Sequence, residues 1–206
     1  HPLGQVMKKR LQRREVVHFL LHQRDDLMVV AGLGAPAWDI TAAGDHPLSF
    51  PLWGAMGGAG LIGLGLALAQ PKRNVLVVTG DGEMLMGLGS LAVIGAHKPP
   101  NLSIVVLDNE HYGETGMQKT VTGLGVDLVG IAKSAGLAQS MLVTNKTELE
   151  NLRTEIYKKG KSRPGALFAQ VKVSSEKLPL ELPPRDGAYL KNRFRIALLG
   201  PEVALA

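Results

Sequence analysis

Two short polar segments of this chain follow apolar runs and carry residue types that suit a metal-bound phosphate group. Gly80-Asp81-Gly82 comes directly after the apolar run 75–79, and Asp108-Asn109 follows the run 102–107. A carboxylate and a side-chain amide offer the oxygen ligands that Mg²⁺ prefers, and this ion usually keeps coordination places for phosphate and water. Glycines on both sides of the aspartate let a diphosphate approach the backbone closely. The pattern therefore predicts a divalent cation that ties a phosphorylated cofactor to the protein.

The expected metal ligands are the side chains of Asp81 and Asn109 and the backbone carbonyl of His111. Three protein oxygens leave three places in an octahedral shell, enough for two diphosphate oxygens and one water. An alternative role for Asp81 is the N-cap of a helix over residues 83–96. A second polar pair after the next apolar run favours the metal site over the cap.

Two turns are expected to offer backbone N–H groups to the phosphates. Gly82 and Glu83 open a helix, and the free N–H groups of a helix start favour anions. The turn after the apolar run 27–31 holds three small residues, Gly32, Gly34 and Ala35. Their spacing mimics a dinucleotide fingerprint, but the acidic residue needed about 20 positions later is absent from residues 50–53. We therefore interpret this turn as a diphosphate contact.

Alternating apolar runs and helical patterns must bring these turns together. The predicted strands are residues 27–31, 75–79, 102–107, 140–143 and 166–171. The predicted helices are residues 8–23, 38–43, 54–69, 83–96, 127–135 and 146–159. This alternation predicts an α/β fold, a three-layer sandwich with a mostly parallel central sheet. In such sheets, ligands bind outside the carboxyl ends of the strands, where all three glycine- or asparagine-containing turns are expected.

The chain of 206 residues is expected to form one main domain over residues 7–174. Residues 1–6 precede Met7 and are interpreted as an expression remnant. Residues 175–206 are Pro-rich at first and end in an apolar patch. We interpret them as an extended C-terminal arm that docks on the domain or on a partner.

The composition excludes several classes of site. There is no cysteine, which removes disulfides, cysteine-ligated zinc, iron–sulfur clusters and a thiol nucleophile, and which fits a cytoplasmic location. The net charge of +5 comes partly from basic runs at residues 8–14 and 158–163. No aromatic side chains interleave with these runs, so we interpret them as solvated helix ends and expect no nucleic-acid partner. The longest apolar stretch, residues 57–69, is shorter than the roughly 20 residues of a membrane span.

On these residues the chain resembles the pyrophosphate-binding domain of thiamine diphosphate enzymes. Within that family it is most similar to the second subunit of sulfopyruvate decarboxylase and the matching half of phosphonopyruvate decarboxylase. The resemblance covers about residues 27–173, and its most specific parts read GDGEMLMGLGSL and LDNEHYGETGMQKT. It implies thiamine diphosphate and Mg²⁺ as cofactors, with Asp81, Asn109 and the His111 carbonyl as metal ligands. Two departures are Asp108, where many relatives have Asn, and Lys119, where they have Pro.

The resemblance also implies roles for single residues. Met56 would lie beneath the cofactor and force its bent shape, which makes the proton transfer within the cofactor intramolecular. The carbonyl of Gly54 would accept a hydrogen bond from the pyrimidine amino group, and His111 completes the expected catalytic set. A methionine of the core is the alternative for Met56. The expected cofactor-binding residues are Gly32, Gly34, Ala35, Gly54, Met56, Gly80, Asp81, Gly82, Glu83, Asn109, Tyr112, Gly113, Glu114 and Thr115.

No segment resembles the pyrimidine-binding domain that supplies a glutamate in this family. The resemblance therefore implies a hetero-oligomer with a pyrimidine-binding alpha subunit and with beta–beta contacts. The expected activity is decarboxylation of a small-molecule 2-oxo acid substrate. The alternatives are a carboligase of the acetolactate synthase type and a non-catalytic thiamine-diphosphate-binding protein.

Overall fold

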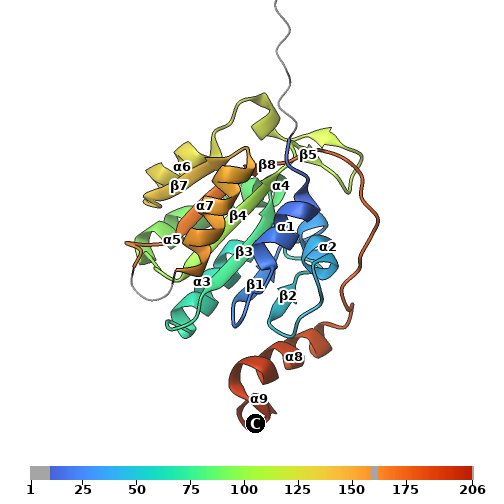
Figure 1. The fold of residues 1–206 in the computed structure, drawn as a ribbon, viewed down its shortest axis with the longest axis vertical. Coiled ribbons are helices and arrows are strands. Elements are labelled where there is room, and N and C mark those ends of the chain that lie inside the picture. Colours follow the sequence, from blue (N-terminus) through green and yellow to red (C-terminus); the bar gives the residue numbers. More distant parts are fainter. Residues whose placement is uncertain (1–9, 159–161, 206) are drawn as a thin grey trace, which may run out of the picture.

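A parallel sheet forms the centre of the molecule (Figure 1). The computed structural model describes residues 10–158 and 162–205. Within them, six strands pair in the order β2-β1-β3-β4-β8-β7, and every neighbouring pair is parallel. The strands are β1 (Met28–Ala31), β2 (Ser49–Pro51), β3 (Val75–Gly80), β4 (Leu102–Asp108), β7 (Gln139–Val143) and β8 (Leu167–Lys172). The predicted α/β sandwich with a parallel sheet is confirmed.

Helices cover both faces of this sheet and create two hydrophobic cores. One face carries α1 (Arg13–Leu21), α2 (Ala35–Ala42) and α7 (Lys146–Tyr157). The other carries α3 (Ala59–Ala69), α5 (Ser90–His97) and α6 (Leu128–Ser134). Successive residues of β3 alternate between the two cores, as a strand of period two requires. This explains why its apolar run has no polar interruption.

The helix expected at residues 54–69 begins later than predicted, at Ala59. Residues 54–58 form a loop, in which Ala55 (φ 56°) and Gly57 (φ 94°) adopt left-handed conformations. The helix itself lies very close to the sheet, since a side-chain carbon built on Gly63 would be 2.2 Å from Val77 Cγ2. The displaced start matters because the loop carries two residues predicted for the site.

The prediction of a single helix at residues 83–96 is also wrong, because this segment contains two helices, α4 (Asp81–Met86) and α5. Gly87 caps α4, and a side-chain carbon there would lie 2.2 Å from the carbonyl oxygen of Gly57. The break therefore lets the backbone of the 54–58 loop rest against the end of α4. The segment between the predicted strand 102–107 and the predicted helix 127–135, for which no element was expected, contains β5 (His111–Tyr112), β6 (Gln118–Lys119) and a 3₁₀ helix at Val121–Leu124.

The C-terminal segment differs from the extended arm that was expected. It ends in α8 (Gly187–Leu199) and α9 (Pro201–Leu205), which lie at the far end of the molecule in Figure 1. Phe194 is buried and packs edge-on against Phe50 at a ring separation of 5.6 Å, and Arg193 pairs with Asp45. Before α8 the chain passes Trp53, whose Nε1–H donates to the carbonyl of Pro184 at 2.7 Å. The arm thus packs on the domain beside the 54–58 loop.

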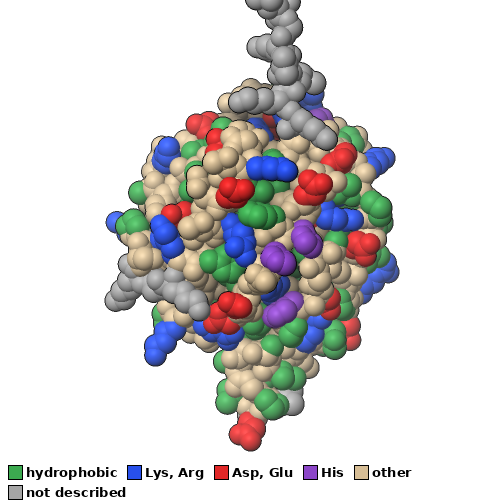
Figure 2. All heavy atoms as spheres, in the orientation of Figure 1, with side chains coloured by type: hydrophobic (Ala, Val, Ile, Leu, Met, Phe, Trp, Pro, Cys, Tyr) green, Lys and Arg blue, Asp and Glu red, His purple; other side chains and the backbone are tan. Residues whose placement is uncertain are grey.

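The basic runs are only partly solvated. Arg13 and Arg163 are buried, and Arg163 donates to the carbonyl of Pro100 and to Ser103 Oγ. On the face shown in Figure 2, Lys and Arg side chains are interspersed with Asp and Glu. Residues 1–6, interpreted as an expression remnant, lie outside the described residues. In the described part of the chain, no helix combines the length and the apolar character needed to cross a bilayer.

Candidate functional site

A pocket lies at the carboxyl ends of β3 and β4 and beside the start of α2, where the parallel sheet predicted it. Its lining residues are Arg13, Leu33, Ala35, Pro36, Met56, Gly80, Asp81, Gly82, Glu83, Leu107, Asn109, His111, Tyr112, Gly113, Glu114 and Thr115. Most of the predicted site residues therefore meet in one place. Gly32, Gly34 and Gly54 do not line the pocket themselves. Gly32 and Gly34 flank the lining residue Leu33, whereas Gly54 lies two residues before the lining residue Met56.

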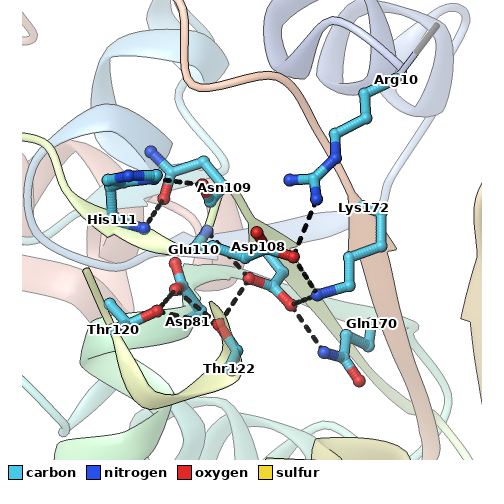
Figure 3. A network of polar contacts seen from close by, with 10 residues as sticks. All are labelled: Arg10, Asp81, Asp108, Asn109, Glu110, His111, Thr120, Thr122, Gln170 and Lys172. Atoms are coloured by element: carbon cyan, nitrogen blue, oxygen red, sulfur yellow. Dashed lines mark hydrogen bonds and ion pairs between the residues drawn. The ribbon is translucent and has the colours of Figure 1, made fainter. Parts of the chain in front are cut away.

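Asp81 begins α4 and is almost fully buried. Its Oδ2 accepts hydrogen bonds from the hydroxyl groups of Thr120 and Thr122 (Figure 3). Burial raises the pKa of Asp81 to about 6, while the Thr120 hydrogen bond opposes the rise and the charge of Asp108 adds to it. Among the described residues, no Lys or Arg pairs with this carboxylate. The group is a buried anion without a cation.

Asp108, at the end of the adjacent strand, has the opposite environment. It is fully buried and accepts from Lys172 Nζ at 2.6 Å, Gln170 Nε2 at 2.6 Å and Thr122 Oγ1 at 2.8 Å. Burial alone would raise the pKa of Asp108, but the bonds from Lys172, Gln170 and Thr122 outweigh it and lower the pKa. The single hydroxyl proton of Thr122 is therefore shared between two carboxylates, of which Asp108 is paired with a cation and Asp81 is not.

Asn109 and His111 form a tight turn at the entrance of the loop. The Oδ1 of Asn109 accepts the backbone N–H of His111 at 3.0 Å, and the carbonyl of Asn109 lies 2.8 Å from His111 Nδ1. Figure 3 shows this pair beside Asp81, from the end of the neighbouring strand. In the described ranges no three acidic or His side chains form a metal cluster. The predicted set has a different composition, since it combines a carboxylate, an amide and a backbone carbonyl.

Glu83 connects the pocket floor to the loop that carries Met56. Its Oε2 accepts from the Thr79 hydroxyl at 2.6 Å, and its Oε1 has no partner among the described residues. Burial raises its pKa, while the Thr79 hydroxyl and the nearby N–H groups of Gly57 and Ala59, which form no direct hydrogen bond to the carboxylate, oppose the rise. The side chain fills the space beside Gly32, where an added carbon would be 1.5 Å from Glu83 Oε2. Gly32 is therefore required by packing against Glu83.

Met56 is half-exposed and forms part of the pocket wall. The alternative of a core methionine is therefore wrong. The left-handed residues on both sides, Ala55 and Gly57, turn the chain so that Met56 leaves the apolar layer. Gly54 has open space around it, since an added side-chain carbon would meet no atom within 4 Å.

Three polar residues at the site were not predicted. Arg13 lines the pocket from α1, and its Nη1 donates to Asp39 Oδ2 and, at 3.4 Å, to the carbonyl of Ala35. The pKa of Glu114 is raised by burial, and the charge of Arg13 opposes this rise. Thr120 and Thr122 were missed as well, because Thr120 caps the 3₁₀ helix at Val121–Leu124 and Thr122 lies in it, a local structure that the sequence analysis did not predict.

A family model for the thiamine pyrophosphate enzymes, namely their C-terminal TPP-binding domain, matches residues 33–165. The chain belongs to this family. Thiamine pyrophosphate is the same compound as thiamine diphosphate, so the resemblance seen in the sequence is confirmed. The matched range contains every predicted site residue of this TPP-binding domain except Gly32, and it excludes Arg13.

Several curated proteins are similar to this TPP-binding chain. Sulfopyruvate decarboxylase subunit beta of Methanocaldococcus jannaschii is 37% identical over 172 residues, which are 83% of this chain and 88% of the relative. The subunit of that name from Methanothermobacter thermautotrophicus is 42% identical over 126 residues, 61% and 67% of the two chains. Phosphonopyruvate decarboxylase of Streptomyces viridochromogenes is 40% identical over 188 residues, and the match spans only 44% of it.

Solved structures show the same fold. Benzoylformate decarboxylase from Polynucleobacter necessarius superimposes with a TM-score of 0.68 at 20% identity, covering 86% of this chain and 36% of that one. A thiamin diphosphate-dependent enzyme from Mycobacterium smegmatis gives a TM-score of 0.65 at 22% identity, with 84% and 35% covered. The TPP-binding domain thus corresponds to about a third of these larger enzymes.

Proposed function

We propose that this chain is the thiamine-diphosphate- and Mg²⁺-binding subunit of a 2-oxo acid decarboxylase. The observation that carries the proposal is the buried carboxylate of Asp81, which lacks a cation in the described structure and lies beside Asn109 in a glycine-lined pocket. A buried ionised carboxylate is costly unless a cation compensates it. A divalent ion held by Asp81, Asn109 and the carbonyl of His111 would supply that charge.

The pocket also suits a diphosphate. Gly80 and Gly113 line it, and a side-chain carbon built on either would meet no atom within 4 Å. Phosphate oxygens can therefore approach the backbone there, next to the start of α4. The loop from His111 to Thr115 completes the wall. Glu83, Tyr112 and Glu114 belong to the same cofactor-binding surface.

Thiamine diphosphate, when bound, supplies the carbon nucleophile and the electron sink for decarboxylation. The residues of this chain hold and orient it. Met56 would support the bent shape of the bound cofactor from the loop that packs against Gly87, and the carbonyl of Gly54 would accept a hydrogen bond from the pyrimidine amino group. His111 and Thr115 line the pocket wall and would contact the 2-oxo acid.

The catalytic glutamate is proposed to come from a partner subunit. The relatives from Methanocaldococcus and Methanothermobacter are named as beta subunits, and the chain aligns with most of their length. A hetero-oligomer with a pyrimidine-binding alpha subunit accounts for both facts. Contacts between two beta chains, the identity of the 2-oxo acid and a cytoplasmic location remain predictions.

Calorimetry on the full chain tests the cofactor site. Wild type should bind thiamine diphosphate only with Mg²⁺, and Asp81→Ala should lose this affinity. Asp127→Ala is a matched control, because Asp127 is an exposed helix N-cap outside the pocket. Unchanged Mg²⁺-dependent affinity in Asp81→Ala would refute the proposed metal site.

Activity assays test the chemistry and the partner. The chain alone should release no CO₂ from sulfopyruvate or phosphonopyruvate, and the chain purified with its pyrimidine-binding partner should do so. Robust decarboxylation by the isolated chain would exclude the split site. Analysis of products from a single 2-oxo acid separates the alternatives, since an aldehyde indicates a decarboxylase, an acyloin indicates a carboligase, and no product with bound cofactor indicates a binding protein.

A further inference from the structure

Arg13 reaches the pocket from outside the matched family range. It is the first residue of α1, it is only 7% exposed, and it lines the pocket together with Ala35, Pro36 and Glu114. An arginine keeps its charge in such a place. Its Nη1 contacts Asp39 and the carbonyl of Ala35, whereas Nε and Nη2 have no acceptor among the described residues. Donors of a buried cation are therefore available at the pocket wall.

The local charges leave this cation in excess. Asp39 is fully buried and pairs with two arginines, through Oδ2 with Arg13 and through Oδ1 with Arg14 at 3.1 Å. One carboxylate cannot neutralise two guanidinium groups. Glu114, the other acidic group near Arg13, is not within ion-pair distance of it in the described structure. An anion in the pocket would take up the remaining charge.

The sheet order places this cation away from the proposed metal ligands. Asp81 and Asn109 follow β3 and β4, whereas α2 follows β1, on the other side of β3. Gly34 (φ 80°) turns the chain so that α2 begins at the pocket, next to Arg13. A ligand with two phosphates could therefore bind the metal at the β3 and β4 side of the pocket and still reach Arg13 and the first turn of α2 at the other side.

We propose that Arg13 binds the terminal phosphate of the cofactor and thereby makes the site selective for a diphosphate over a monophosphate. This inference rests on the proposed function. The planar guanidinium fork offers two parallel donors to a phosphate, a geometry that a lysine ammonium does not reproduce. Arg13 is a binding residue in this role and takes no part in the bond-breaking steps.

Arg14 supplies a matched control. Both arginines pair with Asp39, so replacing either one removes a contact between α1 and α2, but only Arg13 lines the pocket. The experiment is calorimetry with Mg²⁺ on the full chain, with thiamine diphosphate and thiamine monophosphate as the two ligands. The variants are Arg13→Met, Arg13→Lys and Arg14→Met.

Arg13→Met should weaken binding of thiamine diphosphate on the order of 10- to 100-fold, the usual effect of losing charged hydrogen bonds. Its affinity for thiamine monophosphate should change less than about threefold, so the preference for the diphosphate shrinks. Arg13→Lys should lie between wild type and Arg13→Met, and it is the variant to compare if Arg13→Met does not fold. Arg14→Met should bind both ligands as wild type does.

Three results would overturn the inference. Wild-type affinity in Arg13→Met, together with loss in Asp81→Ala, would remove the role of Arg13 and leave the proposed function intact. Equal weakening in Arg14→Met would show that the ion pairs to Asp39, and not a phosphate contact, carry the effect. Absence of Mg²⁺-dependent binding in wild type would refute the proposed function and this inference together.

Discussion

Replacing Asp81 by Asn should stabilise the metal-free protein while it abolishes the metal site. The carboxylate is buried and has only hydroxyl donors in the described structure, from Thr120 and Thr122. An asparagine keeps an acceptor oxygen for these hydroxyls and carries no charge. Stability and cofactor affinity should therefore change in opposite directions in this variant.

The magnitude follows from the pKa of Asp81. Burial raises this pKa from 3.8 to about 6, and each unit corresponds to about 1.4 kcal/mol. A carboxyl whose pKa is raised by folding stabilises the protein below its unfolded pKa and loses that contribution as the pH rises through the folded value. Without Mg²⁺, wild type should therefore be less stable than Asp81→Asn at pH 8 by about 2 to 3 kcal/mol. The difference should shrink toward zero near pH 4.

Urea denaturation in EDTA, followed by circular dichroism between pH 4.5 and pH 8, measures this difference. Asp39, Glu83 and Glu114 also have pKa values raised by burial, but they are present in both proteins and cancel. Asp127→Asn is the control, because this exposed N-cap accepts either residue. The inference would be refuted if the stabilities of wild type and Asp81→Asn changed with pH in parallel. It would also be refuted if Asp81→Asn were less stable than wild type at pH 8.

Three further substitutions test the surroundings of the site. Gly82→Ala would place a carbon 2.3 Å from the Tyr112 ring, so calorimetry should show weaker cofactor binding as Tyr112 is displaced; unchanged affinity would contradict this packing. Lys172→Met leaves the buried Asp108 without its cation and should lower the free energy of unfolding by about 3 to 5 kcal/mol in urea denaturation at pH 7. An unchanged free energy of unfolding would show that another group compensates Asp108. Asn101→Ala removes an amide that donates to three backbone carbonyls and should cost about 1 to 3 kcal/mol without changing cofactor affinity.

Strands buried on both faces were the most predictable part of the fold. Residues 75–78 are apolar without interruption because each side chain enters one of two cores. The short strand β2 was missed, since it has three residues and includes Pro51. A proline is tolerated there because β2 lies at the edge of the sheet. Its position depends on the whole sheet, which the local sequence does not encode.

The polar turns at the strand ends were predictable because they follow directly from the strands. The start of α3 was not, because residues 54–69 form one run without charged residues and nothing in it marks Ala59 as the first helical residue. The loop before Ala59 is held out of the helix by the contact between Gly57 and Gly87, which lie far apart in sequence. Arg13 could not be distinguished from Arg14 by type either. Adjacent helical residues point about 100° apart, so the docking of α1 decides which one meets the pocket.

The two carboxylates at the strand tips show how a departure from the family pattern fits the same chemistry. Asp108, one of the two departures noted in the sequence, adds a second buried negative charge, and Thr122 lies within hydrogen-bond distance of both carboxylates. Lys172, from the neighbouring strand β8, pairs with Asp108 and with Glu110 but not with Asp81. Without that lysine the two anions would compete for one external cation. With it, Asp81 is left as the uncompensated carboxylate, which the proposed metal ion would neutralise.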